Sequence, residues 1–373
     1  MTVEYLKRAA PPAAAICTDT AATVQRMLAE IARDGADAAT RFAQMFDGWH
    51  GDIVVGGTAF ASAARSLSQG VEDDIAFAHA RVRDITQRQR DALLALEVEL
   101  IPGLVARQKL IPVNIAGCYV PGGRYAHAAL AILSVCTAKV AGVPHVVAAS
   151  PAHGDAGVSP AFQYAMRLCG TDTVLALGGV QAVASLADGL FTGRPADVIV
   201  GPGNRFVAEA RRMLFGRVGI DVVAGPTESA VIADDTADPG LVAADLVGQA
   251  EHGADSPVWL FTTSRHVGLA VMARGRGLID TLPEPARSAA TSAWRDHAEV
   301  VFVDSREEAC RLSDRYAPEH LQVMAADLDW WLARLTNYGS LFLGEETTVA
   351  YGDRCSGSNH ILPTRGAAAI RAA

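Results

Sequence analysis

The sequence predicts an α/β protein built from two Rossmann-like parallel-sheet domains of an incomplete dinucleotide-binding type, and three observations support this prediction. The chain has 373 residues, which is more than one ordinary hydrophobic core accommodates. From Leu110 onward, short β-branched runs alternate with helical patterns, as in parallel sheets covered on both faces. Glycine-rich turns follow three of the expected strands, although no Gly-x-Gly-x-x-Gly fingerprint follows the first.

The composition is that of a soluble globular protein, with 50% hydrophobic and 20% charged residues. The net charge of −9 argues against a nucleic acid or an anionic membrane as partner, so we expect a small-molecule substrate. The six cysteines are scattered without a Cys-x-x-Cys pair, which is typical of reduced thiols in a cytoplasmic protein. Neither a signal-like N-terminus nor a stretch able to span a bilayer is present.

The N-terminal part of the chain predicts helical packing elements without chemistry. Apolar residues at helical spacing run from Thr20 to Phe46, and a second helical pattern with a charged outer face runs from about Asp73 to Leu96. The chain divides most naturally near Pro112 and Pro226. We therefore expect an N-terminal arm (1–20), a larger domain (21–111 with 226–373) and an inserted dinucleotide-binding domain (112–225).

The alternating region predicts the following elements. Strands are expected near Val113–Val120, Val146–Ala149, Val174–Leu177, Val198–Val200, Asp221–Ala224, Val231–Ala233, Val258–Thr262 and Val300–Val303. Helices are expected at Ala128–Val140, Ala161–Leu168, Gln181–Leu186 and Arg205–Phe215.

Three glycine turns end strands of the inserted domain: Gly117–Arg124, Gly178–Gln181 and Gly201–Asn204. In open α/β sheets such turns line the ligand crevice, and the N-termini of the helices that follow suit phosphates. Each turn taken alone is better explained as a simple turn of the backbone. Together they favour a dinucleotide site of non-standard form.

A helix over Asp238–Gly248 is predicted by Asp238 as N-cap and Pro239 at the first helical position. Gln249 and His252, three residues apart, project from one side of its last turn. An amide oxygen and an imidazole in this arrangement can bind zinc if other segments complete the shell. The alternative is a polar helix end with a solvated histidine.

The pair Glu319-His320 offers a carboxylate and an imidazole for acid–base chemistry. On a strand the two side chains would point to opposite faces, whereas in a turn both can face one cavity. Asp353, in a segment rich in donors and turn formers, is a reasonable third oxygen ligand for a metal. Its alternative is a turn-forming aspartate beside Gly352.

Seven motifs in this order resemble the histidinol dehydrogenase family, over nearly the whole chain. They are Gly117–Arg124, Gly178–Gln181, Gly201–Asn204, Ala224–Glu228, Gln249–His252, Ala317–Leu321, and Gly352-Asp353 through Asn359-His360. The resemblance implies an oxidoreductase that uses zinc and NAD to convert an alcohol to a carboxylate.

One segment resembles a particular branch of that family. After Pro121-Gly122-Gly123, histidinol dehydrogenases usually continue with Tyr-Pro-Ser-Ser, whereas this chain has Arg124–Ala129. That form, with Leu190–Asp197 and Asp327–Trp331, looks like the sulfopropanediol dehydrogenases, which oxidise (R)-2,3-dihydroxypropane-1-sulfonate to sulfolactate with two NAD. A sulfonate favours a guanidinium and other fixed donors, which Arg124 and His127 can supply. The alternative for Arg124 is a surface or diphosphate-facing charge.

The resemblance also implies roles for single residues. His320 would be the general base for the hydroxyl proton, and Glu319 would activate water onto the aldehyde. Zinc would be held by Gln249, His252 and Asp353, which also contact the substrate. The NAD contacts would be Tyr119, Gln181 and Asn204, and further substrate contacts would be Arg124, His127, Thr227 and His360.

Members of the family continue for several dozen residues past the motif Leu362-Pro363-Thr364, with a tail that reaches the partner subunit and supplies a Glu and a fourth zinc-ligand His. The sequence ends at Ala373, so the resemblance predicts that this tail is missing and that a homodimer is weakened. Water as the fourth zinc ligand and a truncated product both remain open. The alternatives for function are a histidinol dehydrogenase and an inactive member that only binds ligand.

Overall fold

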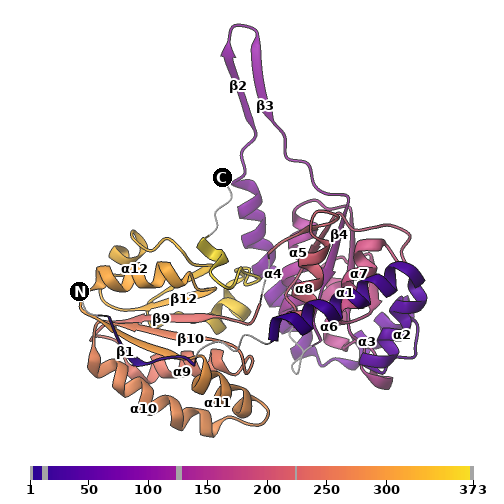
Figure 1. Ribbon diagram of the computed structural model, residues 1–373. Helices are drawn as coiled ribbons and strands as arrows, with labels where there is room; N and C mark the ends of the chain where they lie inside the picture. The colour runs from indigo at the N-terminus through magenta and orange to yellow at the C-terminus, as the bar shows by residue number, and fades with distance from the viewer. Residues whose placement is uncertain (1–2, 11–15, 123–127, 223–224, 370–373) are drawn as a thin grey trace. The chain divides into compact units, whose positions relative to one another are not determined.

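The computed structural model describes residues 3–10, 16–122, 128–222 and 225–369 (Figure 1). The chain separates into two compact units. The C-terminal unit comprises Met1–Ile16, Val222–Gly352 and His360–Ala373, and the N-terminal unit comprises Cys17–Asp221 and Asp353–Asn359.

The N-terminal unit contains a five-stranded parallel sheet in the order β6-β5-β4-β7-β8. In chain order this is 3-2-1-4-5, the order of a Rossmann sheet, with the direction of winding reversed between β4 and β7. The strands are β4 (Ile115–Tyr119), β5 (His145–Ser150), β6 (Thr173–Ala176), β7 (Val198–Val200) and β8 (Gly219–Ile220). The connecting helices are α5 (Ala128–Val140), α6 (Pro160–Leu168), α7 (Gly179–Asp188) and α8 (Arg205–Leu214), with a 3-10 turn at Gly154–Ala156.

The first helices of the chain pack on this same sheet. Helices α1 (Ile16–Asp34) and α2 (Ala36–Asp47) bury Val24, Ile31 and Phe42 in one cluster with Leu175 of β6 and Ile199 of β7. The segment 21–111 therefore belongs with the middle of the chain, which differs from the expected assignment to a domain with 226–373. An apolar helix face requires a sheet to cover but does not specify which sheet, so the pattern alone could not make this choice.

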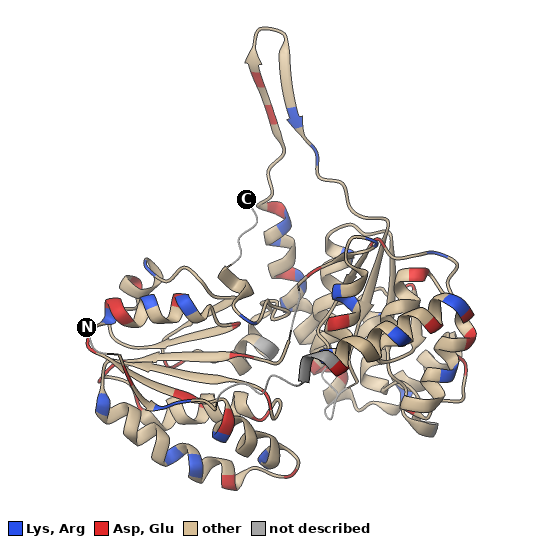
Figure 2. Cartoon of the chain, in the orientation of Figure 1, with Lys and Arg blue, Asp and Glu red and all other residues tan. Residues whose placement is uncertain are grey.

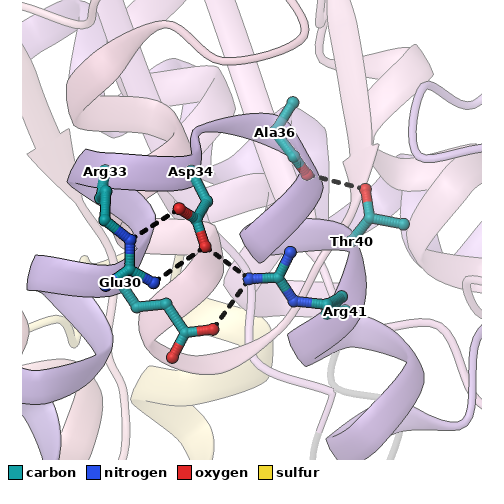
Figure 3. A network of polar contacts seen from close by, with 6 residues as sticks. All are labelled: Glu30, Arg33, Asp34, Ala36, Thr40 and Arg41. Atoms are coloured by element: carbon teal, nitrogen blue, oxygen red, sulfur yellow. Dashed lines mark hydrogen bonds and ion pairs between the residues drawn. The ribbon is translucent and has the colours of Figure 1, made fainter.

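An ion-pair network joins the first two helices at a sharp break (Figure 3). Gly35 has a φ of 61°, a left-handed conformation that ends α1 and lets the chain restart as α2. The guanidinium of Arg41 contacts Glu30 Oε1 at 2.9 Å and Asp34 Oδ2 at 2.8 Å. Because these ion pairs are accessible to solvent, the network contributes modestly to stability.

The long α4 (Gln69–Asp91) follows α3 (Gly57–Ser66) and leads into an antiparallel hairpin of β2 (Leu96–Ile101) and β3 (Leu104–Gln108) (Figure 1). The sequence pattern predicts the end of the second helix near Leu96, whereas α4 ends at Asp91 and a strand begins at Leu96, where apolar and charged residues alternate. In the hairpin, Val98 lies opposite Ala106, whereas Glu97 pairs with Arg107 at 2.9 Å.

The C-terminal unit contains a six-stranded sheet in the order β1-β11-β10-β9-β12-β13. Strand β1 (Val3–Lys7) is antiparallel at one edge, and the five parallel strands repeat the order 3-2-1-4-5. These are β9 (Ser229–Ala233), β10 (Val258–Thr262), β11 (Glu299–Val303), β12 (His320–Met324) and β13 (Ser340–Leu343).

Helices cover both faces of this sheet (Figure 1). One core cluster joins the strands to α9 (Pro239–Ala250), α10 (Arg265–Thr281) and α11 (Ala286–Asp296). The other joins them to α12 (Arg306–Tyr316) and α13 (Leu328–Leu332). Short helical segments follow at Val349–Tyr351, Gly352–Ser356 and Ala367–Ala369.

The two predicted parallel sheets are confirmed, and seven of the eight expected strands lie at the predicted places. The expected strand Asp221–Ala224 is replaced by the shorter β8, and residues 223–224 lie outside the described ranges. Strands of both larger sheets carry few charged residues, which lie mainly on helices and loops (Figure 2). Within the described ranges, the helices lack the combination of length and apolar character that crossing a membrane requires.

Candidate active site

The predicted catalytic pair lies at the amino edge of the C-terminal sheet. His320 is the first residue of β12 and lies opposite Ser229, the first residue of the neighbouring β9. Helix α9 connects β9 to β10 and therefore ends at the same edge, with Gln249 in its last turn and His252 just beyond. Motifs about 70 residues apart in the sequence thus meet because parallel strands share one starting edge.

Glu319 and His320 are both buried, with exposed fractions of 6% and 3%. Glu319 Oε1 lies 3.8 Å from His320 Nε2, so the side chains share one site although the residues are adjacent in sequence. This arises because Glu319 precedes the strand and His320 begins it. The sequence left open whether the two side chains point to opposite faces or to one cavity, and in the structure they lie together.

Glu228 connects this pair to the neighbouring strand. Its backbone N–H donates to Glu319 Oε2 at 3.1 Å, and its carbonyl oxygen accepts from the N–H of His320 at 3.1 Å. Its own carboxyl is buried and accepts from the N–H of Arg365 at 2.8 Å. The sequence indicates no role for Glu228, since a glutamate before a strand carries no signal of such contacts.

Burial raises the pKa of Glu228 to about 7, against smaller opposing effects of the Arg365 N–H and charge. The pKa of His320 is instead lowered to about 3, first by burial and then by the imidazoles of His360 and His252. His320 is therefore a neutral imidazole at physiological pH, the form that accepts a proton. The three histidines lie close enough to interact electrostatically.

We expect the substitution Glu228→Gln to alter how stability depends on pH. Because the folded state raises the pKa of Glu228 from 4.5 to about 7, the wild-type free energy of unfolding loses this contribution as the pH rises through that window. Glutamine does not ionise, so the stability of the variant relative to wild type should increase from about pH 4.5 to about pH 7. Urea unfolding of the zinc-free proteins across this range measures the difference.

The depressed pKa of His320 has the opposite effect on stability, but it is common to both proteins and cancels in their difference. Parallel pH profiles for the wild type and the variant would contradict the raised pKa of Glu228.

The predicted helix that begins after Asp238 is confirmed, since the carboxylate of Asp238 accepts from the N–H of Gly240 at the N-terminus of α9.

The buried Gln249 fits the role of a metal ligand. Its Oε1 has no hydrogen-bond partner among the described residues, and the same holds for Nδ1 of His320. A buried amide oxygen without a partner costs free energy unless a ligand or metal binds to it. Four residues earlier, Asp245 also faces this side of α9 and hydrogen-bonds Gln322 of β12, while burial raises the pKa of Asp245 to about 6.

The rest of the expected ligand set is less completely described. His252 is exposed, and the side chain of Asp353 lies outside the described part of the structure. Among the side chains that the structure describes, no group of three or more His, Cys, Asp or Glu residues is arranged to hold a metal. Gln249, as a glutamine, is not one of the residue types in that set.

In the N-terminal unit, two expected cofactor residues meet at the carboxyl ends of the strands. Tyr119 ends β4, and its hydroxyl accepts from the N–H of Gly179 at 3.1 Å. Gln181 donates through Nε2 to Asp47 at 3.3 Å. Burial raises the pKa of Tyr119 to about 12, so its hydroxyl stays protonated.

Asp47, at the end of α2, was not singled out by the sequence. Its carboxylate also receives the N–H of Gly178 at the N-terminus of α7, while burial raises its pKa. The N–H groups of Gly178 and Gly179, at the start of α7, are therefore bound by Asp47 and Tyr119. The third expected contact, Asn204, caps α8 by accepting from the N–H groups of Phe206 and Val207.

Two expected substrate residues, Arg124 and His127, lie outside the described ranges. Thr227 is half-buried in the turn before β9, and the half-buried His360 interacts with His320. The structure thus brings together Gln249, His252, Glu319, His320 and His360 in one unit.

The chain is similar to known proteins over almost its full length. A family model described as Histidinol dehydrogenase matches residues 13–373. A sulfopropanediol 3-dehydrogenase from Ruegeria pomeroyi is 53% identical, over 99% of this chain and 85% of the relative. A histidinol dehydrogenase from Rhizobium meliloti is 38% identical, over 94% of this chain and 80% of the relative. The crystal structure of histidinol dehydrogenase from Elizabethkingia anophelis matches with a TM-score of 0.89 at 30% identity, covering 96% of this chain and 82% of that one.

Proposed function

Because this chain belongs to the histidinol dehydrogenase family, whose members are oxidoreductases, we propose that it oxidises an alcohol to a carboxylate with zinc and NAD. The proposed substrate is (R)-2,3-dihydroxypropane-1-sulfonate, and the product is sulfolactate. Each turnover then consumes one water and two NAD. The observation that carries the proposal is the buried, neutral imidazole of His320 beside the carboxylate of Glu319.

His320 would take the proton of the substrate hydroxyl. Its Nδ1 is buried and has no hydrogen-bond partner in the described part of the chain, so this nitrogen is available to a ligand. A pKa of about 3 makes the imidazole a weak base, and a bound substrate whose hydroxyl is acidified would compensate.

Glu319 would act in the second oxidation. The N–H of Glu228 holds Oε2 at 3.1 Å and fixes the plane of the carboxylate, which leaves Oε1 on the side of His320. In that position Oε1 can take a proton from the water that adds to the intermediate aldehyde. The adduct again carries a hydroxyl, whose proton would go to His320 after the imidazole has released the first proton to solvent.

Gln249 and His252 would hold zinc, together with Asp353 as implied by the family motif, and the partnerless Oε1 of Gln249 supports this part of the proposal. When bound, zinc supplies Lewis-acid chemistry that lowers the pKa of the alcohol, and NAD accepts the hydride. Tyr119, Gln181 and Asn204 are the proposed NAD contacts. Their support is that the first two are fixed at the carboxyl edge of a sheet with Rossmann strand order.

The sulfonate as substrate is favoured by the 53% identity to the relative from Ruegeria pomeroyi, against 38% for the histidinol dehydrogenase from Rhizobium meliloti. Arg124 and His127 remain proposed contacts of its anionic end.

The decisive experiment follows NADH formation by zinc-loaded protein with dihydroxypropanesulfonate or histidinol as substrate. We expect turnover of the sulfonate with two NADH formed per molecule, and loss of activity when a chelator removes zinc. Turnover of histidinol alone would replace the proposed substrate. Zinc-loaded protein that oxidises neither would contradict the proposed function.

A further inference from the structure

The segment that contains Thr364 and Arg365 is fastened to the turn that precedes β9. The N–H of Gly225 donates to Oγ1 of Thr364 at 2.6 Å, and Thr364 is only 1% exposed. The N–H of Arg365 donates to Oε1 of Glu228 at 2.8 Å. Two hydrogen bonds between residues far apart in sequence therefore fix the position of the Arg365 backbone.

Glu228 also places Arg365 close to the catalytic pair. The same residue that accepts the N–H of Arg365 donates its own N–H to Glu319 and accepts the N–H of His320. Arg365 and the pair are thus separated by the span of one residue, within one compact unit. In the proposed three-carbon substrate, one carbon separates the sulfonate-bearing carbon from the oxidised carbon.

Arg365 adopts an unusual backbone conformation. Its φ is +57°, the left-handed region, which costs a non-glycine residue free energy and persists where surrounding contacts enforce it. The consequence is a defined direction for the side chain, whose Nε lies 3.2 Å from where a Cβ on Gly225 would be. The glycine at 225 therefore leaves room for the guanidinium beside the turn that carries Thr227.

The guanidinium of Arg365 is available to an anion. The residue is exposed, and the side chains that the structure describes include no carboxylate within ion-pair distance of it. The carboxyl of Glu228, whose Oε1 accepts the backbone N–H of Arg365, is also influenced by the charge of this guanidinium but forms no ion pair with it. In a chain of net charge −9 with two glutamates at the site, an anionic substrate requires such a local cation.

We propose that Arg365 receives the sulfonate of the substrate and so determines the selectivity of the enzyme for anionic alcohols. This inference rests on the proposed function for the identity of the substrate. A guanidinium offers two parallel N–H donors to sulfonate oxygens, which an ammonium cannot match. Arg365 belongs to the unit that contains Glu319 and His320.

The test compares two substrates and three variants, all as zinc-loaded full-length protein. Dihydroxypropanesulfonate carries the anion, and propane-1,2-diol offers a neighbouring pair of hydroxyls without it. We expect Arg365→Gln to lower kcat/KM for the sulfonate by about 10- to 100-fold and to leave the neutral diol within about twofold. Arg365→Lys should recover part of the loss. Arg334→Gln, which removes a guanidinium over Trp330 of the same unit, should leave the ratio of the two substrates unchanged.

A second measurement separates this inference from the proposed function. Calorimetric titration of the zinc-loaded protein with dihydroxypropanesulfonate, without NAD, reports binding in the absence of turnover. Binding that Arg365→Gln weakens at least tenfold would support the inference even if the wild type turned over no sulfonate. Equal binding by wild type and variant, no binding by either, or an equal loss on both substrates would overturn it.

Discussion

Replacement of His320 by alanine is expected to lower kcat by about 10²- to 10⁴-fold, the usual contribution of a positioned general base. The imidazole is buried, neutral and 3.8 Å from Glu319, which are the properties of the proposed base for the hydroxyl proton. Zinc content should stay unchanged, because the proposed ligands are other residues. Steady-state NADH formation and metal analysis of the same sample measure both quantities.

The matched control is His266→Ala, which removes an exposed imidazole from α10 of the same unit and should leave kcat unchanged. A His320→Ala protein with full activity would remove the proposed role of His320. Loss of zinc along with activity would instead make it part of the metal site.

A second large effect is expected from Gly201→Ala in the N-terminal unit. A Cβ at this position would lie 2.1 Å from the carbonyl oxygen of Tyr119, and φ is +119°. Relief requires the strand ends of β7 and β4 to separate. We expect a loss of about 3 kcal/mol or more in the free energy of unfolding, and a drop in Tm of about 6–12 °C for a unit of this size.

Gly216→Ala is the control for backbone conformation alone. Gly216 has a φ of +95°, but a Cβ there would meet no atom within 4 Å. Its cost should be about 1 kcal/mol. Thermal unfolding of both variants separates the cost of the contact with Tyr119 from the cost of the positive φ alone. Equal losses of Tm would show that the contact with Tyr119 is relieved without cost.

The fold was predictable where strands are β-branched and buried on both faces, as in Val198–Val200 and Val258–Thr262. Strand β12, His-Leu-Gln-Val-Met, was missed because it contains a single β-branched residue and a polar residue on each side of Leu321. The sheet partners of β1 and of α1 with α2 were not predictable. They depend on contacts between distant segments, which local patterns do not encode.

The candidate site divides in the same way. Glu319, His320, Gln249 and His252 stand in short motifs that indicate chemistry, and the structure brings them to one edge. Asp47 and Arg365 have no motif of that kind, and Glu228 closes the motif Ala224–Glu228 without a role indicated by it. Their contacts join residues 134, 91 and 137 positions apart, so their involvement in the site can be seen only in the folded chain.

The two units share one strand order, but their candidate site residues lie at opposite edges of the two sheets. Tyr119, Gly178 and Gly201 follow the ends of strands, whereas Glu319 and His320 stand where β12 begins. In the C-terminal unit, the loops after β9, β10 and β11 therefore lie across the sheet from the catalytic pair. Variation in the length of those loops, including an inserted peptide, can accumulate without altering the geometry of the reaction centre.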